Sequence, residues 1–392
     1  MIKNLSELPL FRFPPSKDKS LKAWNAADEY LLYHLEEAHI PIKNILIVND
    51  QFGALTTSLI AYSPCYWTDS FLAETAISDN LYRLQSDGHI NAELIEKVTT
   101  IKPQYQIQPN NDVIENQQVE LASQPFDLVV MRIPKHNSLL ELQLTQLKKW
   151  ISPDAKIIAG GMNKEVHNST LDCFEKIIGT TKTSLSRKKA RLVFSTNQDD
   201  TSHTIKANRY TYAPYNLKIS SLPGVFSANK LDIGTRVLLN YLPENIANKK
   251  CIDLGCGNGI IGAVIAKQST DNHVLLTDES ALAIESARIN FLHNKLNNGE
   301  FIQTHSLSGI EDRSFDYVFC NPPFHQNNTQ TLSIASAMFK DAAHVLNQNG
   351  EFWVVANRHL PYYKMLQQHF NQVDTISSDP KFVVRVARRP KT

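Results

Sequence analysis

The chain has 392 residues, 42% of them hydrophobic, and its 40 basic residues nearly balance its 39 acidic residues, giving a net charge of +1. This length favours two domains that each bury a core. The small net charge excludes a polyanion partner held by the field of the whole molecule, so nucleic acid would have to bind local basic patches. No stretch approaches the apolar length of a membrane span, and the N-terminus lacks the pattern of a secretory signal. We therefore expect a cytoplasmic protein without a membrane segment.

The five cysteines, at positions 65, 173, 251, 256 and 320, predict reduced thiols. Their number is odd, and three lie within or beside apolar runs, which is typical of buried, unpaired cysteines. Cys251 and Cys256 are not spaced as in a zinc site, and the sequence has no second Cys or His pair that would complete the ligand set. We expect no bound metal.

The first half of the chain alternates between predicted helices and strands. An amphipathic helix over residues 24–35 precedes the apolar strand Ile45–Val48, a turn that ends at Gly53 and a helix over 54–61. Further strands are predicted at 126–131, 156–159 and 191–194. Strands separated by helices predict an α/β domain with a mostly parallel sheet.

Residues 195–206 are polar and lack periodicity, which predicts a linker between a first domain at 1–194 and a second at 207–392. The second half begins with a few strand-like residues and a helix at about 232–242. It then alternates like the first half. Strands are predicted at 251–254, 274–278, 301–302, 317–320, 351–356 and 382–387, and helices at 260–266, 281–290, 332–346 and 361–370.

The two halves repeat one another in the order of their elements. Placing Gly53 on Gly259 superimposes the first strands, and a gap of three residues then places 68–70 on 277–279. Three pairs of positions result: Gly53 with Gly259, Asp69 with Asp278, and Arg132 with Asn321. A repeat of nearly 200 residues is a domain duplication. Because the first copy lacks two of the three turn glycines and the Asn-Pro-Pro sequence, we expect it to be catalytically silent.

A glycine-rich turn follows the strand at 251–254. Gly255, Gly257 and Gly259 allow a ligand to approach the backbone closely, and no Gly-Lys-Ser/Thr of a Walker sequence follows. Asp278 ends the next strand, nineteen residues beyond Gly259, where an acid can accept both hydroxyls of a ribose. The turn and the acid together predict an adenosine-type cofactor without a pyrophosphate.

The sequence Asn321-Pro322-Pro323-Phe324 directly follows the apolar strand at 317–320. The two prolines make the segment rigid. The Asn321 side-chain oxygen and the Pro322 carbonyl can each accept a proton of a planar NH2 group, while Phe324 stacks on the attached ring. This pattern alone does not separate guanine from adenine or from a glutamine amide.

Taken in this order, these motifs resemble those of class I S-adenosylmethionine-dependent methyltransferases that modify amino nitrogens. The whole chain more closely resembles the two-domain family of ribosomal RNA large subunit methyltransferase G, which is related to a small-subunit guanine-N2 methyltransferase. The matching stretches lie at 26–32, 225–227, 231–234, 253–259, 321–326 and 355–360. This resemblance implies two tandem Rossmann-like domains with mostly parallel seven-stranded sheets and helices on both faces.

The resemblance also implies a function and a site. The reaction would be S-adenosylmethionine-dependent methylation of the N2 amine of one guanine in 23S rRNA, free or in an assembling large subunit, with the first copy supporting RNA binding. The implied catalytic residues are Asn321, Pro322, Pro323 and Phe324. The implied cofactor-binding residues are Phe226, Ser227, Asp253, Gly255, Cys256, Gly257, Asn258, Gly259, Asp278, His305 and Asn321. An adenine-N6 or glutamine-N5 methyltransferase and a non-catalytic RNA-binding assembly factor remain alternatives.

Overall fold

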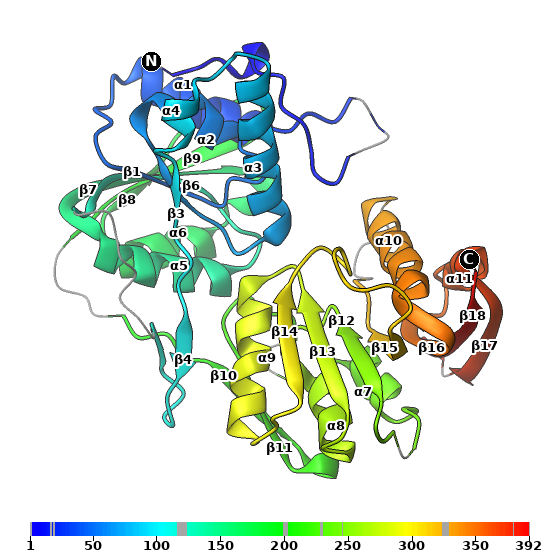
Figure 1. The fold of residues 1–392 in the computed structure, drawn as a ribbon. Coiled ribbons are helices and arrows are strands. Elements are labelled where there is room, and N and C mark those ends of the chain that lie inside the picture. The colour runs from blue at the N-terminus through cyan, green and yellow to red at the C-terminus, as the bar shows by residue number, and fades with distance from the viewer. Residues whose placement is uncertain are drawn as a thin grey trace. The chain divides into compact units, whose positions relative to one another are not determined.

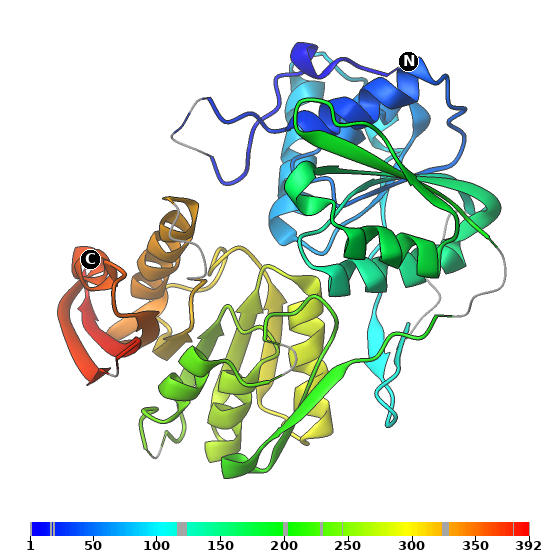
Figure 2. The ribbon, with the colours of Figure 1, turned by 180° about the vertical axis from the view of Figure 1, so that it is seen from behind.

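The computed structural model describes residues 2–15, 18, 20–115, 124–198, 203–227, 230–244, 246–323, 329–378 and 380–391. Internal contacts divide the chain into two compact units, Met1–Lys206 and Ala207–Thr392. In each unit helices cover both faces of a seven-stranded sheet (Figure 1 and Figure 2). The expected α/β class and the mostly parallel sheets are therefore confirmed.

The sheet of the first unit has the strand order β3-β2-β1-β6-β7-β9-β8. Its strands are β1 (Ile45–Val48), β2 (Cys65–Trp67), β3 (Thr99–Thr100), β6 (Phe126–Arg132), β7 (Ile151–Met162), β8 (Thr181–Thr183) and β9 (Ala190–Thr196). The strands from β3 to β7 pair in parallel, and β9 is antiparallel to both β7 and β8. A separate hairpin consists of β4 (Tyr105–Ile107) and β5 (Val113–Glu115). The helices are α1 (Ala26–Glu37), α2 (Ala54–Ser58), α3 (Phe71–Ser86), α4 (Ala92–Ile95), α5 (Asn137–Trp150) and α6 (Asn168–Ile177).

β1 and the middle of β6, residues 128–131, are apolar at every position because both faces of the sheet are covered. In β6, Leu128 and Val130 belong to the core that includes residues of α1, α2 and α3. Val129 and Met131 point to the other face, into the core that includes residues of α5 and α6. A strand covered on both faces needs apolar side chains at every position, which is why β6 was predicted correctly from sequence.

The second unit repeats this arrangement, with the strand order β14-β13-β12-β15-β16-β18-β17. Its strands are β12 (Lys250–Leu254), β13 (His273–Asp278), β14 (Gly299–Gln303), β15 (Phe315–Cys320), β16 (Leu346–Asn357), β17 (Phe370–Ser378) and β18 (Phe382–Pro390). A hairpin of β10 (Asn208–Tyr212) and β11 (Leu217–Ser221) precedes the sheet. The helices are α7 (Ile233–Leu239), α8 (Ile260–Gln268), α9 (Ala281–His293), α10 (Thr329–Val345) and α11 (Tyr362–His369). The shared strand order supports the predicted duplication.

Hydrogen bonds between the strands fix the alignment of the two copies at the end of β2 and β13. The Asn49 amide donates to the Trp67 carbonyl, and the Gly255 amide donates to the Thr277 carbonyl, both at 2.9 Å. Asn49 and Gly255 are equivalent positions when Gly53 is placed on Gly259. Trp67 is therefore equivalent to Thr277, which requires a gap of four residues.

The predicted gap of three residues was wrong by one position. Ser70 and Ser280 confirm the longer gap, because each caps the helix that follows with its side-chain oxygen. With this register Thr68, and not Asp69, stands where the second copy has Asp278. A single-residue shift could not be detected from sequence, because Thr-Asp occurs in both copies at this point.

The predicted linker begins later than its sequence suggested. β9 continues to Thr196, and Ser195 is buried opposite Ile157 of β7. Backbone pairing in a sheet does not depend on apolar side chains, so a polar pair at the end of a strand leaves no signal in the pattern. Residues 195 and 196 thus belong to the first sheet, and the first unit extends to Lys206.

The described residues contain no helix that is long and apolar enough to cross a membrane. Within the same residues, no three His, Cys, Asp or Glu side chains lie close enough together to hold a metal ion. The five cysteines form no disulfide.

Candidate active site

The predicted site residues of the second unit gather at the carboxyl edge of its sheet. β12 lies between β13 and β15, with Leu254 opposite both Thr277 and Cys320. Asp278 is the last residue of β13, and Gly255 and Asn321 are the first residues after β12 and β15. Ligands of open α/β sheets bind at this edge.

The turn glycines have two different roles. Gly255, Gly257 and Gly259 have φ of 70°, 53° and 76°, a region that favours glycine. A Cβ atom on Gly259 would lie 2.7 Å from the Cβ atom of Ala287 in α9, so this glycine allows helix packing. A Cβ atom on Gly257 would meet nothing within 4 Å. The open space beside Gly257 is where a ligand can approach the backbone.

Asp253 is completely buried at the end of β12. Its Oδ2 atom accepts a hydrogen bond from the Gly262 amide at 2.8 Å, while Oδ1 is buried without a partner among the described residues. Burial raises the pKa of Asp253 to about 8. A buried acceptor without a donor is costly, so Oδ1 suits a donor or cationic group of a ligand.

Asp278 is held against the glycine turn. Its Oδ2 atom accepts from the Gly257 amide at 2.9 Å, and Oδ1 accepts from the Ser280 amide at 3.0 Å. Burial raises the pKa of Asp278, and the hydrogen bonds from Ser280 and Gly257 partly offset this effect. The carboxylate is therefore fixed at the end of β13, next to the open side of the turn.

Asn321 follows β15 and has a fixed side-chain orientation. Its Nδ2 atom donates to Oδ2 of Asp232 at 3.0 Å and to Oγ1 of Thr235 at 2.8 Å. The Asp232 carboxylate is an acceptor, so the nitrogen of the amide must face it. The Oδ1 atom of Asn321 consequently points the other way, and it is buried with no partner in the described part of the chain. It is an acceptor oriented by the protein and left without a donor from the described residues.

The rest of the Asn-Pro-Pro-Phe sequence is described only in part. Pro322 is buried and Pro323 is exposed. Phe324 lies outside the described residues, so its expected stacking role is not tested.

Two predicted cofactor residues, Asn258 and Cys256, also make contacts that shape the turn. The Asn258 side chain donates to the hydroxyls of Ser221 at 3.1 Å and Tyr210 at 3.4 Å, which ties the turn to β10 and β11. Cys256 is buried, and its backbone amide donates to the Thr277 carbonyl at 2.9 Å. Sequence alone did not indicate the two partners of Asn258, because the hairpin lies more than 30 residues earlier in the chain.

The remaining predicted cofactor residues lie in two flanking segments. Phe226 is 51% exposed, and the Ser227 hydroxyl donates to the Lys230 carbonyl at 2.6 Å. His305 is half-buried, and burial lowers its pKa. The neighbouring Thr304 amide donates to the Asp278 carbonyl at 2.9 Å, which places His305 just beyond the ends of β13 and β14.

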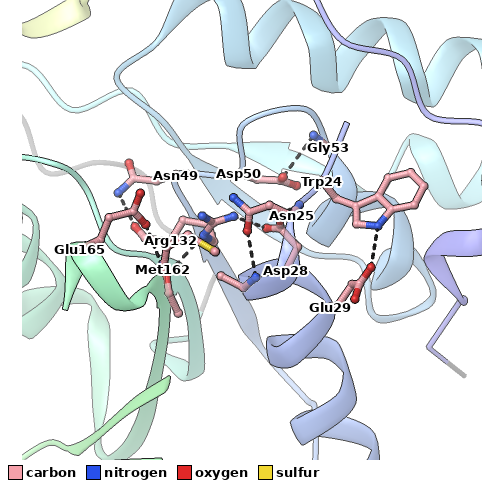
Figure 3. A network of polar contacts seen from close by, with 12 residues as sticks. Trp24, Asn25, Asp28, Glu29, Asn49, Asp50, Gly53, Arg132, Met162 and Glu165 are labelled. Atoms are coloured by element: carbon pink, nitrogen blue, oxygen red, sulfur yellow. Dashed lines mark hydrogen bonds and ion pairs between the residues drawn. The ribbon is translucent and has the colours of Figure 1, made fainter. Parts of the chain in front are cut away.

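In the first unit the corresponding place is filled by an ion pair. Arg132, equivalent to Asn321, is buried and its Nη1 atom contacts Oδ1 of Asp28 at 2.7 Å. Figure 3 shows these two side chains pointing toward one another within a network of polar contacts. Asn49, in the place of Gly255, donates to the Arg132 carbonyl at 3.0 Å. Burial raises the pKa of the neighbouring Asp50 to about 6. At this place in the first copy, Arg132, Asp28 and Asn49 thus find partners within their own unit.

Comparisons with known proteins agree with this geometry. Residues 1–199 match the RLMG N-terminal domain family, and residues 216–385 match the methyltransferase small domain family. The chain is 38% identical over 384 residues to ribosomal RNA large subunit methyltransferase G of Yersinia enterocolitica, covering 96% of this chain and 90% of that protein. The Yersinia pseudotuberculosis protein of the same name is also 38% identical, with 96% and 91% covered.

Among solved structures, the chain resembles the T. thermophilus 16S rRNA N2 G1207 methyltransferase in complex with AdoMet and guanosine. The TM-score is 0.71 at 18% sequence identity, and the match covers 93% of this chain and 92% of that chain. This similarity confirms the tandem methyltransferase fold. The enzyme class and the methyl donor S-adenosylmethionine, expected from the sequence, are confirmed together with the family. The chain belongs to the family of ribosomal RNA large subunit methyltransferase G.

Proposed function

We propose that the second unit methylates the exocyclic N2 amine of a guanine in 23S rRNA. The family name supports a large-subunit ribosomal RNA as the substrate. The structural relative with the same two-domain fold is described as acting on guanine N2, which supports this atom as the target. The observation that carries the proposal is the oriented Oδ1 atom of Asn321, a buried acceptor suited to an amine hydrogen.

The residues at the carboxyl edge fit S-adenosylmethionine. The open space at Gly257 would take the methionine part, and the buried Oδ1 atom of Asp253 would face its ammonium group. Asp278 would accept the ribose hydroxyls, with Phe226, Ser227 and His305 flanking the cofactor. When bound, the sulfonium supplies an electrophilic methyl group.

The chain positions the amine for this reaction. Oδ1 of Asn321 would accept one N2 hydrogen, and the Pro322 carbonyl would accept the other, with Phe324 stacked on the base. These contacts turn the electron pair of the nitrogen away from the protein acceptors and toward the methyl carbon. The nitrogen forms the new bond to carbon, the carbon–sulfur bond breaks, and the extra proton leaves to water. Orientation and exclusion of water then supply much of the rate, without a strong base.

The target guanine has to reach this edge unpaired. Guanine N2 lies inside a duplex, and enzymes that modify a base remove it from the stack or use single-stranded RNA. The first unit, whose equivalent place is filled by Arg132 and Asp28, would support RNA binding without chemistry. The substrate would be 23S rRNA, either free or in an assembling large subunit.

Radiolabelled methyl transfer to unmodified 23S and 16S rRNA, followed by nucleoside analysis, tests this proposal. We expect label in N2-methylguanosine from 23S rRNA. Label in adenosine or in protein would instead favour the adenine-N6 or glutamine-N5 alternative. RNA binding without any transfer would favour a non-catalytic assembly factor.

The variant Asn321→Ala tests the residue on which the proposal depends. We expect methyl transfer to fall by about 100-fold or more, as for removal of one oriented polar group in other active sites. The Kd for S-adenosylmethionine, measured by calorimetry, should stay within about twofold, because the variant leaves the contacts at Gly257, Asp253 and Asp278 in place. Asn349→Ala, at an exposed position of β16, is the matched control. Full activity of Asn321→Ala would rule out this site assignment.

A further inference from the structure

A pocket lies near the proposed base site. It has a volume of about 480 Å³ and is lined by Asn357, Arg358, His359, Pro380 and Lys381. The first three residues come from the end of β16 and the turn after it, and the last two precede β18. The Arg358 amide donates to the Lys381 carbonyl at 3.0 Å, so the two segments are joined.

The pocket lies at the same edge of the sheet as Asn321. β15 and β16 are parallel neighbours, with Cys320 opposite Val354. Continuing this register, Asn357 is two residues beyond the position opposite Asn321. With strands about 4.8 Å apart and a rise of about 3.3 Å per residue, the two Cα atoms are about 8 Å apart. A chain whose base reaches Asn321 would therefore pass this pocket.

The lining residues suit one nucleotide of a single strand. Arg358 and Lys381 contribute two cationic side chains to the lining. The His359 imidazole provides an aromatic surface for a base, and the Pro380 ring provides an apolar one for a base or ribose. Single-stranded nucleic acid is bound by aromatic surfaces together with basic groups. The Oδ1 atom of Asn357 is buried and has no partner there, so it can accept from a base or hydroxyl.

The first copy provides an internal comparison, because the two equivalent segments are joined there by the same backbone hydrogen bond. The Asn163 amide donates to the Lys189 carbonyl at 2.8 Å, so Asn163 is equivalent to Arg358. Two residues later Glu165 turns back, and its Oε2 atom accepts from the Met162 amide at 2.8 Å. In the same register Lys164, Lys188 and Lys189 stand at the places of His359, Pro380 and Lys381, so this place carries basic residues in both copies. The second copy differs by Arg358 in place of an amide and by the neighbouring base site.

We propose that this pocket binds the nucleotide adjacent to the target guanine. Its phosphate would lie between Arg358 and Lys381, and its base or ribose would lie against Pro380. This inference rests on the proposed function and identifies where the RNA of the same site is held.

The double variant Arg358→Ala/Lys381→Ala tests the pocket in the full chain, with 23S rRNA transcript as the probe. The matched control is Lys218→Ala/Lys267→Ala, which removes the same charge at exposed positions of the second unit away from the carboxyl edge. We expect the Kd for RNA to rise about tenfold relative to the control. The slope of log K against log salt should fall by about 0.7, the effect of one lost contact to single-stranded phosphate. The Kd for S-adenosylmethionine should not change.

The possible outcomes distinguish a failure of the pocket inference from a failure of the proposed function. If the wild type methylates rRNA but the double variant matches the control in RNA affinity and salt slope, the pocket inference is wrong and the function stands. If both RNA and cofactor affinity fall, the two residues have a structural role and the inference is also wrong. If the wild type transfers no methyl group to rRNA, the pocket inference fails with the function on which it rests.

Discussion

The side chain of Asn321 shows how a catalytic orientation depends on residues far away in sequence. Asp232 is the N-cap of α7, and Thr235 lies in its first turn. Together they accept both hydrogens of the Asn321 amide, although they precede it by 89 and 86 residues. The sequence indicated Asn321 from its rigid context and Asp232 only as the start of a helix. Their contact depends on tertiary structure, so it could not be read from local pattern.

Thr235 is a positioning residue, and Thr235→Val tests its role. Valine preserves the shape but removes the oxygen that accepts from Asn321, so the amide loses one of its two anchors. One hydrogen bond of about 1 kcal/mol corresponds to a loss of about fivefold. We expect kcat for methyl transfer to fall by about that factor, with the Kd for S-adenosylmethionine unchanged.

The conservative variant Thr235→Ser distinguishes this role from simple packing. Serine keeps the oxygen and loses a methyl group, so it should restore most of the wild-type kcat. The orienting role would be refuted if Thr235→Val kept full kcat, or if Thr235→Ser were impaired as much as Thr235→Val.

At the scale of elements, the turn between β12 and α8 contains one glycine that leaves room for a ligand, Gly257, and one that allows helix packing, Gly259. Gly257 and Gly259 both have positive φ, so alanine introduces backbone strain of about 1 kcal/mol at either position. Only at Gly259 would the new Cβ atom also collide, since Ala287 of α9 is 2.7 Å away. The two positions form a matched pair of variants within one turn.

We expect Gly257→Ala and Gly259→Ala to have different effects. Gly257→Ala should weaken S-adenosylmethionine binding by about tenfold or more and reduce the thermal stability of the second unit only slightly, because its methyl group occupies the open side of the turn. Gly259→Ala should destabilise the unit by about 2 kcal/mol or more, from strain together with overpacking. Calorimetry and hydrogen exchange of second-unit peptides measure the two effects. Equal loss of stability in both variants would contradict this division.

The elements that the sequence predicted well are those buried on both faces. β1, β6, β12 and β15 are short apolar runs, and their type and position were correct to within two residues. β17 was missed because it is an edge strand with many polar, partly exposed positions, so it has no apolar pattern. The hairpin of β10 and β11 was only indicated as strand-like residues, because its apolar side chains alternate with polar ones over just five positions on each strand.

At the scale of the whole molecule, both copies keep a contact between the end of the central strand and the preceding helix, but different side chains make it. In each unit the residue at the carboxyl end of the central strand, Arg132 or Asn321, contacts the first turn of the helix that precedes the sheet. In the first unit this contact is the buried pair of Arg132 and Asp28. In the second it joins Asn321 to Asp232 and Thr235. Asp28 and Thr235 occupy the same position in their helices, so the pairs are equivalent.

The site differences between the copies were partly visible in the sequence. The loss of the turn glycines and of the Asn-Pro-Pro sequence could be read directly from an alignment of the two halves. The ion pair could not, because Asp28 lies 104 residues before Arg132. The place of Asp278 was also misassigned until the strand register showed that Thr68 occupies it.

We expect one S-adenosylmethionine per chain, bound by the second unit. In the first unit Thr68 cannot offer a carboxylate to the ribose, Gln51 occupies the place of Gly257, and Arg132 fills the place of the base site. Calorimetry should therefore give a stoichiometry near one, and Gly257→Ala should weaken the same single event. Hydrogen exchange should show protection by the cofactor in peptides of 250–305 and none in 45–100. A stoichiometry of two, or protection in the first unit that persists in Gly257→Ala, would show that the first copy still binds the cofactor.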